Sequence, residues 1–266
     1  MEIGHLMDLT GRRAIVTGAV GGLGTIIAET LAELGSDLVL VDRQEQSIDV
    51  LKNRLVSTYG VSVVGVECDL EQQDQRSALI QSIVDDGREL NILINNAAFV
   101  GSSDLPGWSV PFSEQSIETW RRAIEVNLIA PFELCQGVSD VMKRSRGANI
   151  INIASIYGQF GPDWRLYENT NMSNPAAYGA SKAGLIQFTK WLSTTLAPYV
   201  RVNALSPGGI LGGQPDIFVE MYSSRTPLGR MATYDDFRGC VAFLASNLSG
   251  YVTGQTINVD GGWGIW

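Results

Sequence analysis

The sequence has a single histidine, His5, and few cysteines among its 266 residues. Because this histidine lies in a short N-terminal lead, we expect neither a Ser/His/Asp triad nor a metal site with paired histidine ligands. Cys68, Cys135 and Cys240 are odd in number, widely spaced and without metal-ligand spacing. We therefore expect reduced, buried thiols that behave as small hydrophobic side chains, and no metal centre.

Basic charge and long hydrophobic runs are also scarce. Lysine and arginine total 19 against 28 aspartate and glutamate residues, which gives a formal net charge of −9. An acidic balance disfavours nucleic acids and anionic membranes as partners, because both attract a basic face. No apolar run approaches the ~18 residues that span a bilayer, and residues 1–16 lack the layout of a secretory signal. We expect a cytoplasmic protein that acts on a small molecule.

Short β-rich segments recur along the chain, separated by longer segments with helical spacing. The expected strands are 13–18, 37–42, 62–69, 91–98, 148–155, 200–208 and 255–262. The first helical segment places Ile26, Leu31 and Leu34 on one side with Thr30, and Gly35 then caps its C-terminus. Alternating strands and helices indicate a parallel sheet with helices on both faces. The sequence therefore predicts an α/β fold with one doubly wound domain over residues 1–266 and a seven-stranded sheet.

The stretch TGAVGGLG, residues 17–24, follows the first expected strand and opens the first expected helix. Gly18 suits a tight turn, Gly22 lets backbone N–H groups approach a pyrophosphate, and Gly24 lets helix and strand pack closely. A plain tight turn is the alternative interpretation of these glycines. Because the helix start carries partial positive charge, the pattern favours a dinucleotide site.

Acidic residues follow the second and third expected strands. Asp42 can accept hydrogen bonds from the adenosine ribose and would repel a 2′-phosphate, which favours NAD over NADP. Arg43 beside it is a residue that a 2′-phosphate would attract. Asp69 could meet the adenine edge, or it could cap a helix that starts near Glu71.

The stretch YGASK places Tyr178 and Lys182 four residues apart, on one face of a helix. A phenol has a reference pKa near 10, and an adjacent ammonium group favours the phenolate and lowers that pKa. Tyrosine and lysine at this spacing are common on solvated helices, so the pair alone decides little. Ser155, at the end of the fifth expected strand, and Asn127, within IEVNLIAPF, strengthen the case. A satisfied core amide is the alternative for Asn127.

Taken together, these features resemble the short-chain dehydrogenase/reductase family over essentially the whole chain. The matching features are TGAVGGLG, Asp42, Asp69, NNAA at 95–98, Asn127, Ser155, YGASK, SPGG at 206–209, TPLGRM at 226–231 and TGQTINVDGG at 253–262. The resemblance implies a Rossmann-type domain and an NAD(P)-dependent oxidoreductase that interconverts a secondary alcohol and a ketone by hydride transfer.

The resemblance also implies a role for each catalytic candidate. Tyr178 would be the general acid/base, and Ser155 would orient the substrate oxygen. Lys182 would bind the nicotinamide ribose and lower the Tyr178 pKa, while Asn127 would hold a water in a proton relay and Asn95 would brace the central strands. The implied cofactor residues are Gly18, Gly22, Leu23, Gly24, Asp42, Arg43, Asp69, Leu70, Asn96, Ala97, Tyr178, Lys182, Pro207, Gly208 and Ile210.

Two departures from the family pattern lie close to the expected cofactor. Family members often carry a threonine soon after the Pro-Gly pair, but Pro207 and Gly208 lead into GILGGQ. Ala98 replaces the commonest glycine after NNA. The threonine contact with the nicotinamide carboxamide is therefore missing, whereas the alanine is a small change that we expect to be tolerated.

Residues 156–177 form a longer stretch between the catalytic serine and tyrosine than most family members have. Its mixture of aromatic and short polar side chains suits a polyhydroxylated ligand better than an acyl chain. Trp164, Arg165 and Tyr167 are the candidate substrate residues, and Arg165 could bind a phosphate or carboxylate. We expect a second substrate-binding region over residues 209–230. Packing of 156–177 against a neighbouring subunit is the alternative.

Several wider expectations follow from the resemblance. The 156–177 pattern and the VDGGWGIW ending also resemble dehydrogenases of bacterial surface-sugar and flagellin-glycan pathways. Trp263 and Trp266 are large apolar side chains, which we expect to be buried at a subunit contact of a tetramer or dimer. The alternative functions are an NADP-dependent reductase of ketones or 3-oxoacyl thioesters and a non-catalytic nucleotide-sensing module. The second of these would predict a broken Ser/Tyr/Lys set.

Overall fold

A seven-stranded sheet forms the centre of the computed structural model, which describes residues 2–100 and 105–266. The strands are β1 (Arg13–Thr17), β2 (Asp37–Asp42), β3 (Val63–Glu67), β4 (Ile92–Asn95), β5 (Asn149–Ile153), β6 (Arg201–Pro207) and β7 (Thr256–Val259). They lie in the order β3-β2-β1-β4-β5-β6-β7, and every neighbouring pair is parallel. The structure therefore confirms the predicted α/β fold with a single doubly wound, Rossmann-type domain.

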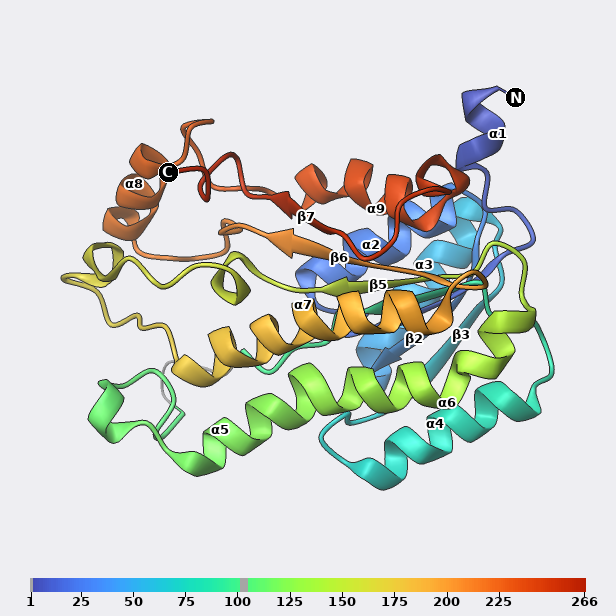
Figure 1. Ribbon diagram of the computed structural model, residues 1–266, viewed down its shortest axis with the longest axis horizontal. Helices are drawn as coiled ribbons and strands as arrows, with labels where there is room; N and C mark the ends of the chain where they lie inside the picture. Colours follow the sequence, from blue (N-terminus) through green and yellow to red (C-terminus); the bar gives the residue numbers. More distant parts are fainter. Residues whose placement is uncertain (1, 101–104) are drawn as a thin grey trace.

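Helices cover both faces of this sheet (Figure 1). They are α1 (Ile3–Met7), α2 (Gly22–Glu33), α3 (Glu45–Tyr59), α4 (Gln73–Asp85), α5 (Ile117–Ile124), α6 (Ala130–Arg144), α7 (Ala176–Leu196), α8 (Asp216–Arg225) and α9 (Arg238–Ala245). Helices α2, α3 and α9 share one hydrophobic core with the sheet, and α4, α6 and α7 share the other. Helix α8 and the C-terminus lie beyond the carboxyl edge of the sheet.

Strand β1 shows why the sheet needs cover on both sides. All five of its residues are buried, and Val16 packs into the α2 core while Ile15 packs into the α4 core. Helix α2 buries the predicted Thr30 and Leu31, and Ile27 is buried in place of the predicted Ile26. Gly35 follows its end with φ of +93°, in agreement with the predicted cap.

Six of the seven strands end earlier than the sequence predicted, whereas β2 has the predicted bounds. Residues expected to extend β3 and β4, up to 69 and 98, leave the sheet as loops. Cys68 and Cys135 are buried thiols, and Cys240 is partly buried. In residues 2–100 and 105–266, no helix combines the length and hydropathy that a membrane-crossing segment requires.

Candidate active site

The carboxyl ends of the central strands border one long cleft of about 1040 Å³. Apart from Gly22, every residue expected to hold the cofactor lines this cleft, from Gly18 and Asp42 to Tyr178 and Lys182. Most of these residues lie at the ends of five strands or in the loops that follow them, and the others lie in helices α2 and α7. The fold thus brings together residues that lie up to 192 positions apart, from Gly18 to Ile210.

The glycine-rich turn after β1 is held by close backbone contacts. Gly18 has φ of +62°, and a Cβ there would lie 2.8 Å from the Cα of Ala97. A Cβ on Gly24 would lie 1.9 Å from the Gly18 carbonyl oxygen. Asn96 Nδ2 donates to the Thr17 and Gly18 carbonyls at 2.9 and 3.0 Å. Thr17 opens the motif TGAVGGLG but was given no role there, and its Oγ1 accepts from the backbone N–H groups of Asn96 and Ala97 at 3.0 and 3.1 Å.

The start of helix α2 offers unpaired backbone donors to the cleft. Its N-cap is Gly21, and no side chain makes a capping hydrogen bond there. The first N–H groups of a helix lack intrahelical partners and carry partial positive charge, so they suit a phosphate. The ring of Tyr234 fills the space that a side chain on Gly22 would occupy, because a Cβ on Gly22 would lie 2.2 Å from Tyr234 Cζ.

Both acidic candidates line the cleft, and Asp42 contacts the glycine-rich turn whereas the Asp69 carboxylate contacts its own turn. Asp42 Oδ2 accepts from the Val20 N–H at 3.0 Å, and its Oδ1 accepts from the Arg43 N–H at 2.7 Å. Asp69 Oδ1 accepts from the Glu71 N–H at 3.0 Å. Helix α4 begins only at Gln73, so Asp69 caps the turn before the helix rather than the helix itself.

Ser155, Tyr178 and Lys182 meet at the end of β5. Ser155 Oγ accepts from the Tyr157 N–H at 3.2 Å. Helix α7 carries Tyr178 and Lys182 one turn apart, and Lys182 Nζ donates to the Ile153 carbonyl at 2.7 Å. The ammonium nitrogen lies 5.9 Å from the centre of the Tyr178 ring. The strand and the helix thus place all three groups together, whatever the length of chain between them.

Burial controls the titration of both α7 groups. It lowers the pKa of Lys182 to about 8, since a buried ammonium loses hydration and has no carboxylate partner among its contacts. Burial also raises the pKa of Tyr178, and the Ser155 hydroxyl opposes this shift. That Lys182 lowers the Tyr178 pKa stays a prediction, because burial is the largest effect on this phenol in the protein without its cofactor.

Asn127 is fully buried within a π-helical turn, Glu125–Ile129, that joins α5 to α6. Its Oδ1 accepts from the Phe99 N–H at 2.6 Å, and its Nδ2 donates to Ser181 Oγ at 3.0 Å. Ser181 in turn donates to the Tyr178 carbonyl at 2.8 Å. The side chain is thus a satisfied core amide that holds α7 near Tyr178, and it does not line the cleft.

A second cavity of about 250 Å³ opens beside Ser155 and Tyr178. Its walls come from the two predicted substrate regions, 156–177 and 209–230, and from the loop before α5. The side chains that line it include Trp108, Tyr157, Tyr167, Asn174, Gln214, Phe218 and Tyr222. Tyr157 and Tyr167 hydrogen-bond through their hydroxyls at 2.7 Å, and Asn174 Nδ2 donates to Tyr167 at 3.2 Å. The wall nearest the catalytic residues therefore presents hydroxyl and amide groups among aromatic rings.

The three candidate substrate residues take different positions. Tyr167 lines the cavity, whereas Trp164 and Arg165 do not. The Trp164 side chain is 56% exposed, and the Arg165 guanidinium pairs with Asp163 at 2.8 Å on the outer surface. The short 3-10 turn Trp164–Tyr167 rotates consecutive side chains in different directions, and this local geometry was not visible in the sequence.

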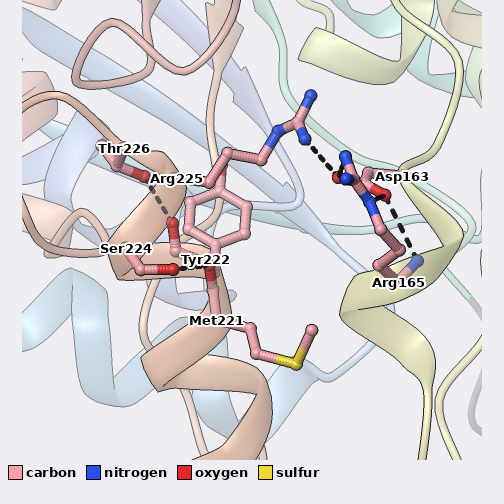
Figure 2. A network of polar contacts seen from close by, with 7 residues as sticks. All are labelled: Asp163, Arg165, Met221, Tyr222, Ser224, Arg225 and Thr226. Carbon is pink, nitrogen blue, oxygen red and sulfur yellow. Dashed lines mark hydrogen bonds and ion pairs between the residues drawn. The ribbon is translucent and has the colours of Figure 1, made fainter.

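Asp163 ties the 156–177 segment to helix α8 (Figure 2). Its carboxylate lies between Arg165 and Arg225 and accepts hydrogen bonds from both. The Arg225 guanidinium also lies 5.2 Å above the ring of Trp263. Residues that are far apart in the sequence thus form one outer layer behind the cavity.

Trp263 is buried by its own chain, which corrects the expectation that a subunit contact covers it. Its ring packs against Tyr222 at 5.8 Å, and against Tyr157 and Phe160 at 6.3 Å each. Trp266 is 72% exposed, so a subunit contact remains a prediction for that residue alone.

The comparison with protein families agrees with this geometry. The sequence model of a family described as enoyl-(acyl carrier protein) reductase matches residues 18–264. The 3-oxoacyl-[acyl-carrier-protein] reductase FabG of Aquifex aeolicus is 32% identical over 261 residues, covering 96% of this chain and 98% of that protein. The chain belongs to the short-chain dehydrogenase/reductase family. This short-chain dehydrogenase/reductase is also 29% identical to the post-translational flagellin modification protein A of Campylobacter coli, over 97% of this chain and 100% of that protein.

Solved structures of other short-chain dehydrogenases/reductases share the whole fold. A gluconate 5-dehydrogenase from Burkholderia cenocepacia, in complex with NADP and tartrate, has a TM-score of 0.86 and 29% identity over 100% of both chains. A short-chain dehydrogenase from Leptospira borgpetersenii with bound NAD+ has a TM-score of 0.84 and 32% identity, over 96% of this chain and 94% of that one. This family member is therefore an oxidoreductase of alcohols and ketones that uses a nicotinamide cofactor.

The residues present fit a nicotinamide dinucleotide. The uncapped start of α2 suits the pyrophosphate, and the Cβ-free Gly18 lets the turn lie against Ala97. The cleft extends from Asp42 to the Ser155, Tyr178 and Lys182 group without interruption. As the sequence predicted, residues 209–214 contain no threonine that could contact the nicotinamide.

Proposed function

We propose that the protein interconverts a secondary alcohol and a ketone on a polar, sugar-like substrate, with NAD as its cofactor. The observation that carries the proposal is the hydrogen-bonded wall of Tyr157, Tyr167 and Asn174 beside Ser155 and Tyr178. Burial raises the pKa of Tyr157, so this hydroxyl stays protonated and can donate. The similarity to a flagellin modification protein and to a gluconate dehydrogenase supports a polar substrate.

In the proposed reaction, bound nicotinamide supplies or accepts the hydride. Ser155 Oγ and the Tyr178 hydroxyl hold the substrate oxygen, and Tyr178 donates a proton to it in reduction or removes one in oxidation. Lys182, whose pKa of about 8 is near neutral, can exchange protons next to Tyr178. Asn127 keeps α7 in place through Ser181, and its part in a proton relay stays a prediction.

The preference for NAD rests on Asp42. A 2′-phosphate would have to lie near this carboxylate, with Arg43 as the adjacent positive charge. Binding titrations should show tighter NADH than NADPH for the parent. Asp42→Ala should shift the ratio of the NADPH and NADH affinities towards NADPH by about tenfold or more. Asp42→Asn removes the negative charge but keeps the shape of the side chain, so it separates the two effects. Equal or tighter NADPH binding by the parent would contradict the assignment.

The substrate wall gives a second expected result. Tyr167→Phe removes the hydroxyl that bonds to Tyr157 and Asn174, and we expect it to raise KM for the polar substrate about fivefold or more. NADH affinity should not change. The Trp164→Ala/Arg165→Ala variant should have a smaller effect on KM, because both side chains lie outside the cavity. A larger effect from the double variant would show that the 156–177 segment closes over the substrate in another way.

An NADP-dependent 3-oxoacyl thioester reductase is the second candidate, and the 32% identity to FabG favours it. Steady-state assays that compare sugar-derived alcohols with a 3-oxoacyl thioester separate the two. We expect the higher kcat/KM for the sugar-derived substrate, and the opposite order would replace the proposal. A nucleotide-sensing module is disfavoured, because Ser155, Tyr178 and Lys182 are intact and lie together.

Assembly and location complete the proposal. We infer a homo-oligomer, a tetramer or dimer, in the cytoplasm. The exposed Trp266 and Ile265 at the end of the chain support a contact between copies, because large apolar side chains tend to be covered. Light scattering of the purified chain tests the oligomeric state.

A further inference from the structure

Tyr234 lies at the cofactor cleft, although no motif in the sequence pointed to it. Tyr234 is the first residue of the 3-10 turn Tyr234–Phe237. It is 37% exposed and lines the cleft. A Cβ on Gly22 would lie 2.3 Å from its hydroxyl oxygen, and a Cβ on Gly212 would lie 3.9 Å from the same atom. The phenol therefore bridges the start of α2 and the loop that follows β6.

The backbone around Tyr234 is firmly positioned. Thr233 and Asp236 form a capping box, and Arg230 pairs with Asp236 at 2.7 Å. Ala232 donates its N–H to the Gly209 carbonyl at 2.9 Å and accepts from the Leu211 N–H at 2.8 Å. The ring is thus held on the same frame as the loop over the cleft, and it is not a freely moving surface side chain.

The hydroxyl of Tyr234 is distinct in its position. Among the described residues that line the cleft, only Ser155, Tyr178 and Tyr234 carry a hydroxyl group. The first two lie at the reacting end, beside Lys182. Tyr234 lies at the uncapped start of α2, where the loop 209–214 contributes no side-chain hydroxyl. An anion at that helix start would therefore have one side-chain hydroxyl beside it, that of Tyr234.

We propose that Tyr234 donates a hydrogen bond to the pyrophosphate of the dinucleotide and holds it against the start of α2. The inference rests on the dinucleotide cleft of the proposed function. A neutral donor to a charged acceptor gives one of the stronger hydrogen bonds in proteins. Loss of the hydroxyl alone should therefore weaken dinucleotide binding about tenfold.

The test uses Tyr234→Phe, which removes the oxygen and keeps the ring. Equilibrium titrations are made with NADH, with ADP-ribose, which keeps the pyrophosphate but lacks nicotinamide, and with adenosine, which lacks both. We expect NADH and ADP-ribose to bind about tenfold more weakly to the variant, and adenosine to bind equally well. Tyr251→Phe is the matched control, because Tyr251 is fully exposed and does not line the cleft.

Each other outcome has a defined meaning. If ADP-ribose binds the Tyr234→Phe variant as tightly as the parent, or more tightly, the inference is wrong. Equal weakening of adenosine would indicate a general distortion and would also overturn it. If the parent binds neither NADH nor ADP-ribose, the proposed cofactor fails, which separates that failure from the failure of the Tyr234 contact.

A stability measurement tests the Gly22 contact without any ligand. Gly22→Ala would place a methyl group within 2.2 Å of the Tyr234 ring, so it should lower the melting temperature of the parent. The same change should cost less in a Tyr234→Ala background, where the ring is removed. Equal costs in both backgrounds would show that the ring does not rest on Gly22 and would remove the structural basis of the proposal.

Discussion

Tyr178→Phe is expected to lower turnover by about 10²–10⁴-fold while NADH still binds. The substitution removes the one ionisable oxygen on this ring and keeps the ring's packing beside Ala177 and Trp108. Burial raises the pKa of the phenol, and in the proposed reaction its hydroxyl would donate the proton in the reductive direction. Single-turnover kinetics with NADH fluorescence measure both quantities in one experiment.

The control for this variant is Tyr199→Phe. Tyr199 lies near the end of α7 and is 62% exposed, so loss of its hydroxyl should leave turnover unchanged. Turnover of the Tyr178→Phe variant within tenfold of the parent would remove Tyr178 from its catalytic role. Loss of NADH binding would instead show that the hydroxyl supports the cofactor site.

Asp163→Ala should release the 156–177 segment from α8 and destabilise the protein. Only 11% of the Asp163 side chain is exposed, and its loss leaves Arg225 without its carboxylate partner. The Arg225 side chain is 30% exposed, so we expect the free energy of unfolding to fall by about 2 kcal/mol, less than for a fully buried ion pair. This loss should lower Tm by about 4–8 °C. KM should rise more than kcat falls, since β5 and α7 still position Ser155 and Tyr178.

The pH dependence and a matched variant identify the cause. Hydrogen bonds from Arg165 and the charge of Arg225 lower the pKa of Asp163. The contribution of Asp163 to the free energy of unfolding is therefore fully present above the pKa of about 4 that this carboxyl has in the unfolded chain. It disappears as the pH falls through the lower pKa of the folded protein. Arg165→Ala should lower Tm much less than Asp163→Ala does, because the Arg165 side chain is 71% exposed and solvent screens its charge. If both variants melt alike at neutral pH, Asp163 does not hold the segment.

The sequence predicted the fold, and it predicted which residues gather at the cleft, for a physical reason. In a parallel sheet, every strand ends at the same edge, so motifs that follow strands must meet there. Asp42, Ser155 and Pro207 could be placed together from that rule alone. The same rule placed Tyr178 beside Ser155 despite the long stretch between them.

The errors arose where tertiary packing decides the outcome. Trp263 was assigned to a subunit contact, because no local pattern shows that Tyr222 and Phe160 return to cover it. Trp164 and Arg165 follow a 3-10 turn whose side-chain directions depend on the Asp163 contacts. No local sequence pattern places Tyr234 at the cleft, since its contact with Gly22 joins residues more than two hundred positions apart.

The 156–177 segment is anchored at both ends, and this has a consequence for how such an enzyme can change during evolution. A Cβ on Gly158 would lie 2.8 Å from the Lys182 carbonyl carbon, so the first turn of the segment rests directly on α7. Pro175 then starts α7 as its N-cap. Insertions, deletions and substitutions between those anchors leave the reacting atoms where they are, and a longer loop costs little entropy. Substrate range can therefore drift in a lineage without any intermediate that has lost its chemistry.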